Sequence, residues 1–392
     1  MDLRIARELE ELRERAQLRS LKIPDAAGRL DLSSNDYLGL SDDPRLKRAV
    51  AEAVARAERV GATGSRLLSG NAREWEEVEA EFAEFAGTEA ALYFGSGYAA
   101  NIGALSSLLR PGDTVFSDAL NHASLIDGIR LSGAAKVIYP HADLEFLEGA
   151  LRDAGGAGAR VIVTESIFSM EGDVARLDAL MELARKCNAS LIVDEAHATG
   201  VWGPEGRGVA VELGLQRETL AIVHTCGKAL GSLGAFVCGS AALREYLINR
   251  ARTFIFSTAM PPYMAGQIRA ALALARTADA ERAHLRTIAA TLREGLVAAG
   301  VACGSDRDGL AAQIVPVILG SNEAALHVAS ELQRGGFAVK AIRPPTVPPG
   351  TARLRISLTS KVTLEDVRRL VAAISAAQKS LPHSASANVV HV

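Results

Sequence analysis

The stretch 161–195, VIVTESIFSMEGDVARLDALMELARKCNASLIVDE, holds two short apolar runs separated by a helical pattern. The runs VIVTE (161–165) and LIVDE (191–195) have the length and composition of buried strands. Residues 177–186 between them have the apolar spacing of a helix. This order of strand, helix and strand is typical of parallel strands joined by a crossover.

Runs of the same kind extend outward from this stretch. They are ALYF (91–94), TVF (114–116), KVIY (136–139), AIVH (221–224) and AFVCG (235–239). Helical patterns alternate with them, for example at 144–151. The alternation predicts an α/β fold with a mostly parallel seven-stranded sheet between helices. Two further helices are expected before the sheet, at 44–60 and 72–85, and we assign residues 41–262 to this large domain.

The remainder of the chain predicts three further parts. Residues 1–40 are expected to form an amphipathic helix, with Ile5, Leu9, Leu12 and Ala16 on one face, and an arm leading to the site. Residues 263–379 are expected to form a smaller α+β domain, and residues 380–392 a frayed tail. The expected elements of the smaller domain are a helical region from 263 to 299, strands at 313–319, 337–342 and 353–358, and helices at 323–334 and from 363.

Composition excludes several classes of protein. The 392 residues include 43 basic and 46 acidic side chains, a net charge of −3, and 48 % are hydrophobic. A chain of this kind buries a large core and has no general electrostatic reason to bind nucleic acid or an anionic membrane. Four widely spaced cysteines without a CxxC pair argue against disulfides and a zinc site. With no apolar targeting segment, the expected location is the cytoplasm.

Polar and reactive residues follow the predicted strands. In an open parallel sheet, ligands bind in the crevice beyond the carboxyl ends of the strands, so these residues are expected to converge there. They are Gly97 and Tyr98, His122, Ser169, Asp194 and His197, and Thr225 and Lys228.

Each of these residues also has an ordinary structural interpretation. The turn at Gly97 is as typical of a tight strand–helix connection as of a phosphate cradle, and Asp194 could cap a helix. Lys228 differs, because the chain has only eight lysines and residues 229–243 carry no charge. An amine beside a buried segment has a lowered pKa and becomes nucleophilic. Pyridoxal phosphate would use a lysine, an acid at its ring nitrogen, an amide-rich phosphate site and a stacking ring together.

Seven motifs, taken in order, resemble those of the α-oxoamine synthases, a branch of the fold-type I pyridoxal-phosphate enzymes. The resemblance extends from about Arg19 to the last helix. The motifs are SSNDYLGL (33–40), GSGYAAN (95–101), NHASLIDG (121–128), TESIFSMEGD (164–173), DEAHATGVWG (194–203), TCGKALG (225–231) and AIRPPTVPPGTARLRISL (341–358).

The resemblance implies a role for each matching residue. Lys228 would be the Schiff-base lysine, Asp194 would pair with the ring nitrogen, and His197 would pair with the ring hydroxyl oxygen. His122 would stack on the ring, with Ser169 near it. Gly97, Tyr98 and Thr225 would lie at the phosphate. Thr258 would reach the phosphate of the neighbouring subunit, because the family usually forms homodimers with shared sites.

The resemblance also implies substrates and a reaction. Arg343 would hold a substrate carboxylate, Arg19 and Thr346 would lie along the path of the acyl donor, and Asn35 would lie near the site. The segment RPPTVP (343–348) resembles the member of the family that joins L-alanine to a pimeloyl thioester. The implied reaction is a decarboxylating Claisen condensation in which Lys228 removes the α-proton. Whether the thioester is carried by coenzyme A or by a carrier protein stays open.

Three alternatives remain beside this interpretation. The tetrapeptide DEAH (194–197) also occurs in helicase-type ATPases, but the P-loop that those need is missing, since Ala229 follows the only Gly-Lys pair. A non-catalytic binding protein would not need Lys228. A sister synthase that uses glycine and an acetyl donor, or a longer acyl chain, is opposed only by the RPPTVP resemblance.

Overall fold

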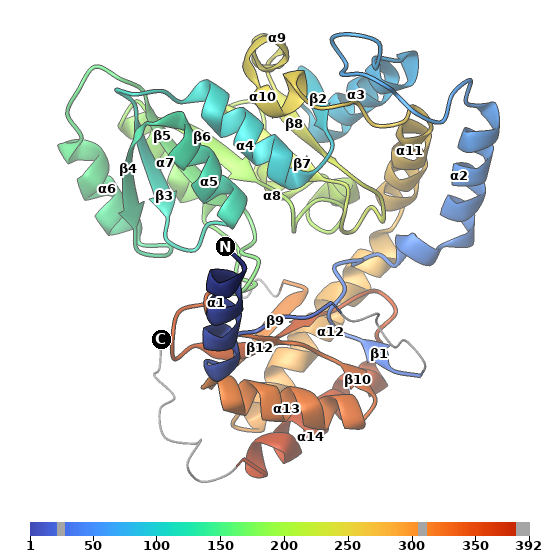
Figure 1. Cartoon of the computed structure of the whole chain (residues 1–392), viewed down its shortest axis with the longest axis vertical. Helices are drawn as coiled ribbons and strands as arrows, with labels where there is room; N and C mark the ends of the chain where they lie inside the picture. The colour runs from blue at the N-terminus through green and yellow to red at the C-terminus, as the bar shows by residue number, and fades with distance from the viewer. Residues whose placement is uncertain (22–27, 305–311, 382–392) are drawn as a thin grey trace. The chain divides into compact units, whose positions relative to one another are not determined.

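A computed structural model describes residues 1–21, 28–304 and 312–381. The chain divides into two compact units (Figure 1). The larger unit contains Asp36–Ser169 and Val174–Ala283. The smaller unit contains Met1–Asn35, Met170–Asp173 and the chain from His284 onward. The chain passes between these units at residues 35 and 283, and most of the tail expected at 380–392 lies outside the described residues.

The larger unit is built on a seven-stranded sheet with the order β2-β8-β7-β6-β5-β3-β4. Its strands are β2 (Ala90–Phe94), β3 (Thr114–Asp118), β4 (Ala135–Tyr139), β5 (Arg160–Glu165), β6 (Ser190–Asp194), β7 (Ala221–Thr225) and β8 (Ala235–Gly239). β8 runs antiparallel to both of its neighbours, β2 and β7, and the other neighbouring pairs are parallel. All seven expected strands are present, and the prediction of a mostly parallel sheet is confirmed.

Helices follow most of these strands, which gives each parallel pair its crossover. The helices of this unit include α2 (Pro44–Arg56) and α3 (Arg73–Ala86), which precede the sheet. Those after β2 are α4 (Gly97–Leu108), α5 (Ala123–Ser132), α6 (Leu144–Asp153), α7 (Leu177–Lys186), α8 (Val209–Glu212), α9 (Ala241–Arg250), α10 (Arg252–Ile255) and α11 (Tyr263–Arg276), with short 3₁₀ turns at Leu40–Asp42 and Pro204–Gly206. β7 and β8 are buried at every position, which explains their unbroken apolar runs. Among the described residues, no helix is long and apolar enough to span a membrane.

The expected helical region 263–299 is interrupted. It forms α11 and α12 (Asp279–Ala298), and the chain turns at Thr277 and Ala278. The buried guanidinium of Arg282 donates to the carbonyls of Ala275, at 2.6 Å, and of Arg276, at 3.2 Å. These bonds satisfy carbonyls that have no partner inside α11 once the helix ends.

The smaller unit combines two short sheets with helices. Its elements are α1 (Asp2–Glu14), β1 (Leu30–Asp31), β9 (Ile314–Gly320), α13 (Asn322–Arg334), β10 (Phe337–Ala338), β11 (Ala341–Ile342), β12 (Ala352–Ser357) and α14 (Leu364–Lys379). The prediction of a single strand at 337–342 is wrong, because the two ends of this segment pair with different strands. β10 lies parallel to β1, whereas β11 joins the antiparallel sheet β11-β12-β9.

Candidate active site

The sheet of the larger unit brings together the ends of β6 and β7. Asp194 is the last residue of β6 and Thr225 the last of β7, and the two strands are parallel neighbours. His197 lies three residues beyond β6, and Lys228 lies three residues beyond β7. The carboxyl ends of adjacent parallel strands share one edge, so these four side chains meet beyond it.

The amine of Lys228 ends a polar chain whose other two members are buried. Its Nζ lies 2.7 Å from Nε2 of His197, and Nδ1 of the same ring lies 2.6 Å from the hydroxyl of Tyr37. Tyr37 is 0 % exposed and His197 is 4 % exposed. Both nitrogens of the imidazole are thereby occupied, and the ring has a defined orientation.

The carboxylate of Asp194 is held by donors on both of its oxygens. The side-chain amide of Asn101, on α4, donates to Oδ2 at 2.6 Å, and the backbone N–H of Ala196 donates to Oδ1 at 2.9 Å. Asp194 is 5 % exposed. These two hydrogen bonds fix the orientation of the carboxylate at the end of β6.

His122 caps α5 and connects to the same network. The backbone N–H of Ser124 donates to its Nδ1 at 3.2 Å, and the hydroxyl of Ser124 lies 2.8 Å from that nitrogen. The Ser124 hydroxyl also accepts from Asn101, at 2.9 Å. Burial lowers the pKa of His122, and the charge of Lys228 lowers it further, against an opposing effect of Asp194. A neutral imidazole suits a ring that stacks on a flat group.

The start of α4 provides backbone donors. Ser96 caps the helix by accepting from the N–H of Ala99 at 3.1 Å, and Gly97 is the first helical residue. The side chain of Thr225 lies beside Gly97. Free amides at the N-terminus of a twelve-residue helix, together with a threonine hydroxyl, form a donor set suited to a phosphate. The hydroxyl of Tyr98 donates to the carboxylate of Asp127.

Glu195, the neighbour of Asp194, is fully buried. Its carboxylate accepts from the backbone N–H groups of Val209, at 3.0 Å, and Ala210, at 2.7 Å. Burial raises the pKa of Glu195 to about 7, although these two bonds oppose the shift. Glu195 therefore holds the start of α8 through two backbone hydrogen bonds.

Two of the remaining predicted residues of the larger unit, Ser169 and Thr258, lie in loops. Ser169 is a buried residue of the loop after β5, at the boundary of the unit. Thr258 is exposed and lines a separate cavity with Arg66, Trp75 and Met260. The N–H of Ala259 donates to the carbonyl of Gly64 at 2.9 Å, so the segment around Thr258 is fastened to the loop 61–71.

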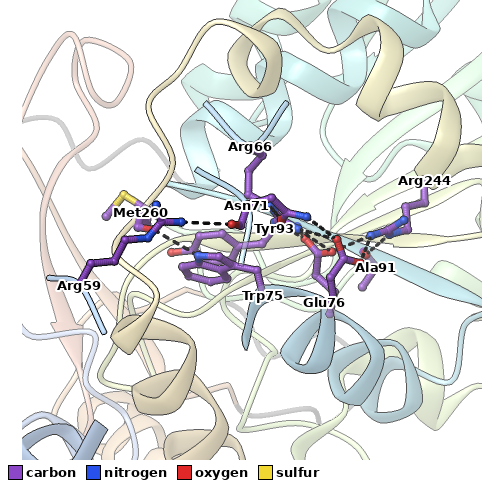
Figure 2. A network of polar contacts seen from close by, with 10 residues as sticks. Arg59, Arg66, Asn71, Trp75, Glu76, Ala91, Tyr93, Arg244 and Met260 are labelled. Carbon is purple, nitrogen blue, oxygen red and sulfur yellow. Dashed lines mark hydrogen bonds and ion pairs between the residues drawn. The ribbon is translucent and has the colours of Figure 1, made fainter. Parts of the chain in front are cut away.

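A charged network supports that cavity (Figure 2). Glu79, which is 2 % exposed, accepts from Arg66 at 2.7 Å and from Arg244 at 2.9 Å. It also accepts from the backbone N–H of Tyr93, at 2.9 Å, and the indole of Trp75 donates to the carbonyl of Met260 at 3.2 Å. One buried carboxylate thus connects the loop 61–71, β2 and α9.

The predicted substrate residues form a second group, in the smaller unit. Arg19 donates to the hydroxyl of Thr346 at 2.8 Å, and Arg343 donates to the carbonyl of Ala16. These residues line a cavity of about 130 Å³. Its lining residues are Gln17, Arg19, Ala341, Ile342, Arg343, Pro344 and Thr346.

Asn35 belongs to a third arrangement, also within the smaller unit. Its Oδ1 accepts from the guanidinium of Arg355 at 3.0 Å, and the same guanidinium donates to the hydroxyl of Ser357 at 2.6 Å. Arg355 lies on β12, where every residue is buried. A buried guanidinium beside a predicted site residue is a candidate anion holder.

Sequence reasoning overlooked Tyr37, Asn101 and Arg355. Tyr37 and Asn101 lie inside motifs that were identified, SSNDYLGL and GSGYAAN. The available signal for Asn101 was a polar side chain among apolar neighbours of a predicted helix. For Arg355 it was a charge inside RLRISL (353–358), a run whose other residues predict a buried strand.

Comparison with known proteins agrees with this geometry. Residues 27–374 match the family of class I and II aminotransferases. The 8-amino-7-oxononanoate synthase of Geobacter sulfurreducens is 46 % identical over 96 % of this chain and 98 % of the relative. The protein of the same name from Herminiimonas arsenicoxydans is 44 % identical, with 92 % and 95 % covered.

Solved structures confirm the fold. A serine palmitoyltransferase from S. paucimobilis, with a bound PLP–myriocin aldimine, superposes with a TM-score of 0.88 at 30 % identity. The match covers 96 % of this chain and 97 % of that one. The 8-amino-7-oxononanoate synthase of Francisella tularensis superposes with a TM-score of 0.78 at 31 % identity, over 90 % and 98 % of the two chains.

Proposed function

The chain belongs to the class I and II aminotransferase family, and we propose that it is a pyridoxal-phosphate-dependent acyltransferase of the 8-amino-7-oxononanoate synthase type. It condenses L-alanine with a pimeloyl thioester and releases carbon dioxide, the free thiol carrier and 8-amino-7-oxononanoate, in biotin biosynthesis. The contact of 2.7 Å between Lys228 and His197, beside Asp194, is the observation that carries this proposal together with the full-length relatives.

The residues at the strand ends fit the cofactor. Bound pyridoxal phosphate supplies an electron-withdrawing ring that acidifies the α-carbon of an amino acid. Asp194 would hold the ring nitrogen, and His122 would lie against a face of the ring. The N-terminal amides of α4 and the hydroxyl of Thr225 would hold the phosphate. Ser169 would lie near the ring.

Proton transfer is assigned to Lys228. Its Nζ would bind the cofactor covalently and then, once released, accept the α-proton of alanine at that same atom. His197 would orient the amine through Nε2 and pair with the hydroxyl oxygen of the cofactor. The partly buried Nζ of Lys228 lies 2.7 Å from His197, within reach of a proton-transfer partner.

Carboxylate binding has two candidate arginines. Arg343 was expected to hold the α-carboxylate of alanine, and it lines the cavity that also contains Arg19 and Thr346. Arg355 is the alternative, because its guanidinium is buried beside Asn35. Either arginine offers the planar fork that binds a carboxylate through two hydrogen bonds. The cavity with Arg19 and Thr346 would receive the acyl donor, carried by coenzyme A or by a carrier protein.

The assembly is proposed to be a homodimer. Thr258 is exposed on a segment fastened to Gly64, and it would contact the cofactor phosphate of the partner subunit. Sedimentation equilibrium tests the dimer. Mixing Thr258→Ala subunits with Lys228→Ala subunits tests the shared site, because a mixed dimer would carry one site that combines both defects and one site without either.

The decisive experiment is a substrate panel. The purified protein is incubated with alanine, glycine or serine, each with acetyl, pimeloyl or palmitoyl thioesters, and the products are identified by mass spectrometry. Product from alanine and a pimeloyl thioester supports the proposal. A sister synthase is the second candidate, since a serine palmitoyltransferase superposes with a TM-score of 0.88, and it predicts a different productive pair.

A further inference from the structure

Tyr37 lies at the end of the buried chain that leads to Lys228. It is part of the segment that connects the smaller unit to α2, and its ring is fully buried. Its hydroxyl lies 2.6 Å from Nδ1 of His197, and the two rings are tilted by 53° with centroids 6.0 Å apart. The contact therefore runs through the hydroxyl and the edge of the imidazole, without stacking.

We infer that Tyr37 is a positioning residue that fixes the orientation of His197 toward Lys228. An imidazole has two nitrogens, and the partner of one determines what the other presents. With Nδ1 held by Tyr37, Nε2 has one available direction, and Lys228 Nζ lies 2.7 Å along it. The inference rests on the proposed role of His197 beside the cofactor.

A phenol hydroxyl is better suited to hold Nδ1 of His197 than a carboxylate, which only accepts, or an amide N–H, which only donates. A hydroxyl both donates and accepts, so Tyr37 can bond Nδ1 whichever nitrogen of His197 carries the proton. When Lys228 donates to Nε2, the proton of the imidazole lies on Nδ1, and the Tyr37 oxygen accepts a hydrogen bond from that N–H. When Nε2 is the donor, the Tyr37 hydroxyl donates to Nδ1. The ring keeps its orientation in both cases.

The surroundings of Tyr37 accommodate its buried hydroxyl and hold its backbone. A buried hydroxyl without a partner costs folding energy, and His197 provides the partner. Leu38 and Leu40 flank it as buried apolar residues, and the carboxylate of Asp36 accepts from the N–H of Leu40 at 2.9 Å. This turn holds the backbone from which the Tyr37 side chain extends.

The test is a double-mutant cycle on cofactor affinity in the full-length protein. Tyr37→Phe keeps the ring and removes the hydroxyl, His197→Gln removes the imidazole, and the double variant removes both. The Kd for pyridoxal 5′-phosphate is measured by equilibrium dialysis, and the absorption spectrum of each loaded variant is recorded. Tyr139→Phe serves as the matched control, because Tyr139 is equally buried but lies on the edge strand β4.

Tyr37→Phe is expected to raise this Kd about two- to ten-fold, the effect of one neutral hydrogen bond, and to shift the absorption maximum of the bound cofactor. In the presence of His197→Gln the same change is expected to have no further effect, because Tyr37 acts through His197. Additive effects in the cycle, or a Tyr37→Phe protein with the Kd and spectrum of the Tyr139→Phe control, would overturn the inference. The cycle measures cofactor binding alone, so it is independent of the substrate panel, which tests the proposed reaction.

Discussion

The side-chain amide of Asn101 lies 2.6 Å from the carboxylate of Asp194, and it connects that carboxylate through Ser124 to His122. Two residues that were expected to contact the cofactor independently are thereby joined by one polar side chain from α4. One hydrogen-bonded network therefore holds the carboxylate of Asp194 and the imidazole of His122.

Asp194→Asn is expected to leave the cofactor bound but to lower kcat about a hundred- to a thousand-fold. The amide has no charge with which to stabilise a protonated ring nitrogen, and the loss of a preorganised electrostatic contact has this order of magnitude. Steady-state kinetics with alanine, together with the absorbance of the bound cofactor, provide the measurement. Activity within a factor of two of the parent would contradict the role of Asp194.

Lys228→Ala is expected to abolish turnover and the visible absorbance of the covalently bound cofactor. No other described residue at the strand ends has an amine that could replace Nζ. The matched control is Lys186→Ala, since Lys186 is an exposed residue that pairs with Glu148 on α6. Near-normal turnover in Lys228→Ala would refute the assignment of the catalytic base.

Arg343→Ala is expected to raise the apparent KM for alanine about ten- to a hundred-fold, since a charge-assisted pair contributes roughly 1.5–3 kcal/mol. Arg343→Lys should recover only part of this, because a point charge lacks the planar fork. The comparison variant is Arg355→Lys. If Arg355→Lys weakens alanine binding and Arg343→Ala does not, the carboxylate is held by Arg355.

Glu195 is expected to make stability depend on pH. Its pKa rises from 4.5 to about 7 on folding, so the folded state retains a proton that the unfolded state releases. The free energy of unfolding should therefore fall as pH increases from about 4.5 to 7, by up to about 3 kcal/mol. Urea denaturation at several pH values measures this slope. Glu195→Gln should flatten it, whereas Glu212→Gln, a change of an exposed residue of α8, should leave it intact.

Glu79→Gln is expected to lower the free energy of unfolding by about 3 kcal/mol. The substitution removes a buried charge while Arg66 and Arg244 retain theirs, and breaking one partner of a buried ion pair has a cost of this order. Glu77→Gln is the control, because Glu77 pairs with Arg269 at the surface, where such pairs contribute less than about 1 kcal/mol. Equal losses of unfolding free energy in the two variants would show that the Glu79 network contributes no more to stability than a surface ion pair.

The sheet could be predicted from the sequence because each of its strands is a short apolar run. The strand expected at 337–342 was wrong because pairing partners decide where a short strand ends. Phe337 pairs with Leu30, which is far away along the chain, whereas Ala341 pairs with Leu354. The break between α11 and α12 depends likewise on Arg282, whose bonds to the carbonyls of α11 become visible only in three dimensions.

The site could be predicted in part. Motifs identified the residues at the strand ends, and the structure brings Asp194, His197 and Lys228 together. The partners of these residues could not be deduced, because Tyr37 and Asn101 come from segments far from them in the sequence. Arg355 was overlooked for a different reason: an arginine in a strand is ordinarily exposed, and its burial depends on β12 lying between β9 and β11.

The antiparallel return of β8 has a kinetic consequence for Lys228. The connection from β7 to β8 spans only residues 226–234, and it is bonded across its base from the N–H of Cys226 to the carbonyl of Gly234 at 2.8 Å. Both ends of the lysine loop are thus anchored in adjacent strands, and its backbone has little freedom. The reach of the amine is then set by the side-chain torsions of Lys228, which in the proposed reaction would keep its effective molarity at the reacting carbon high after every turnover.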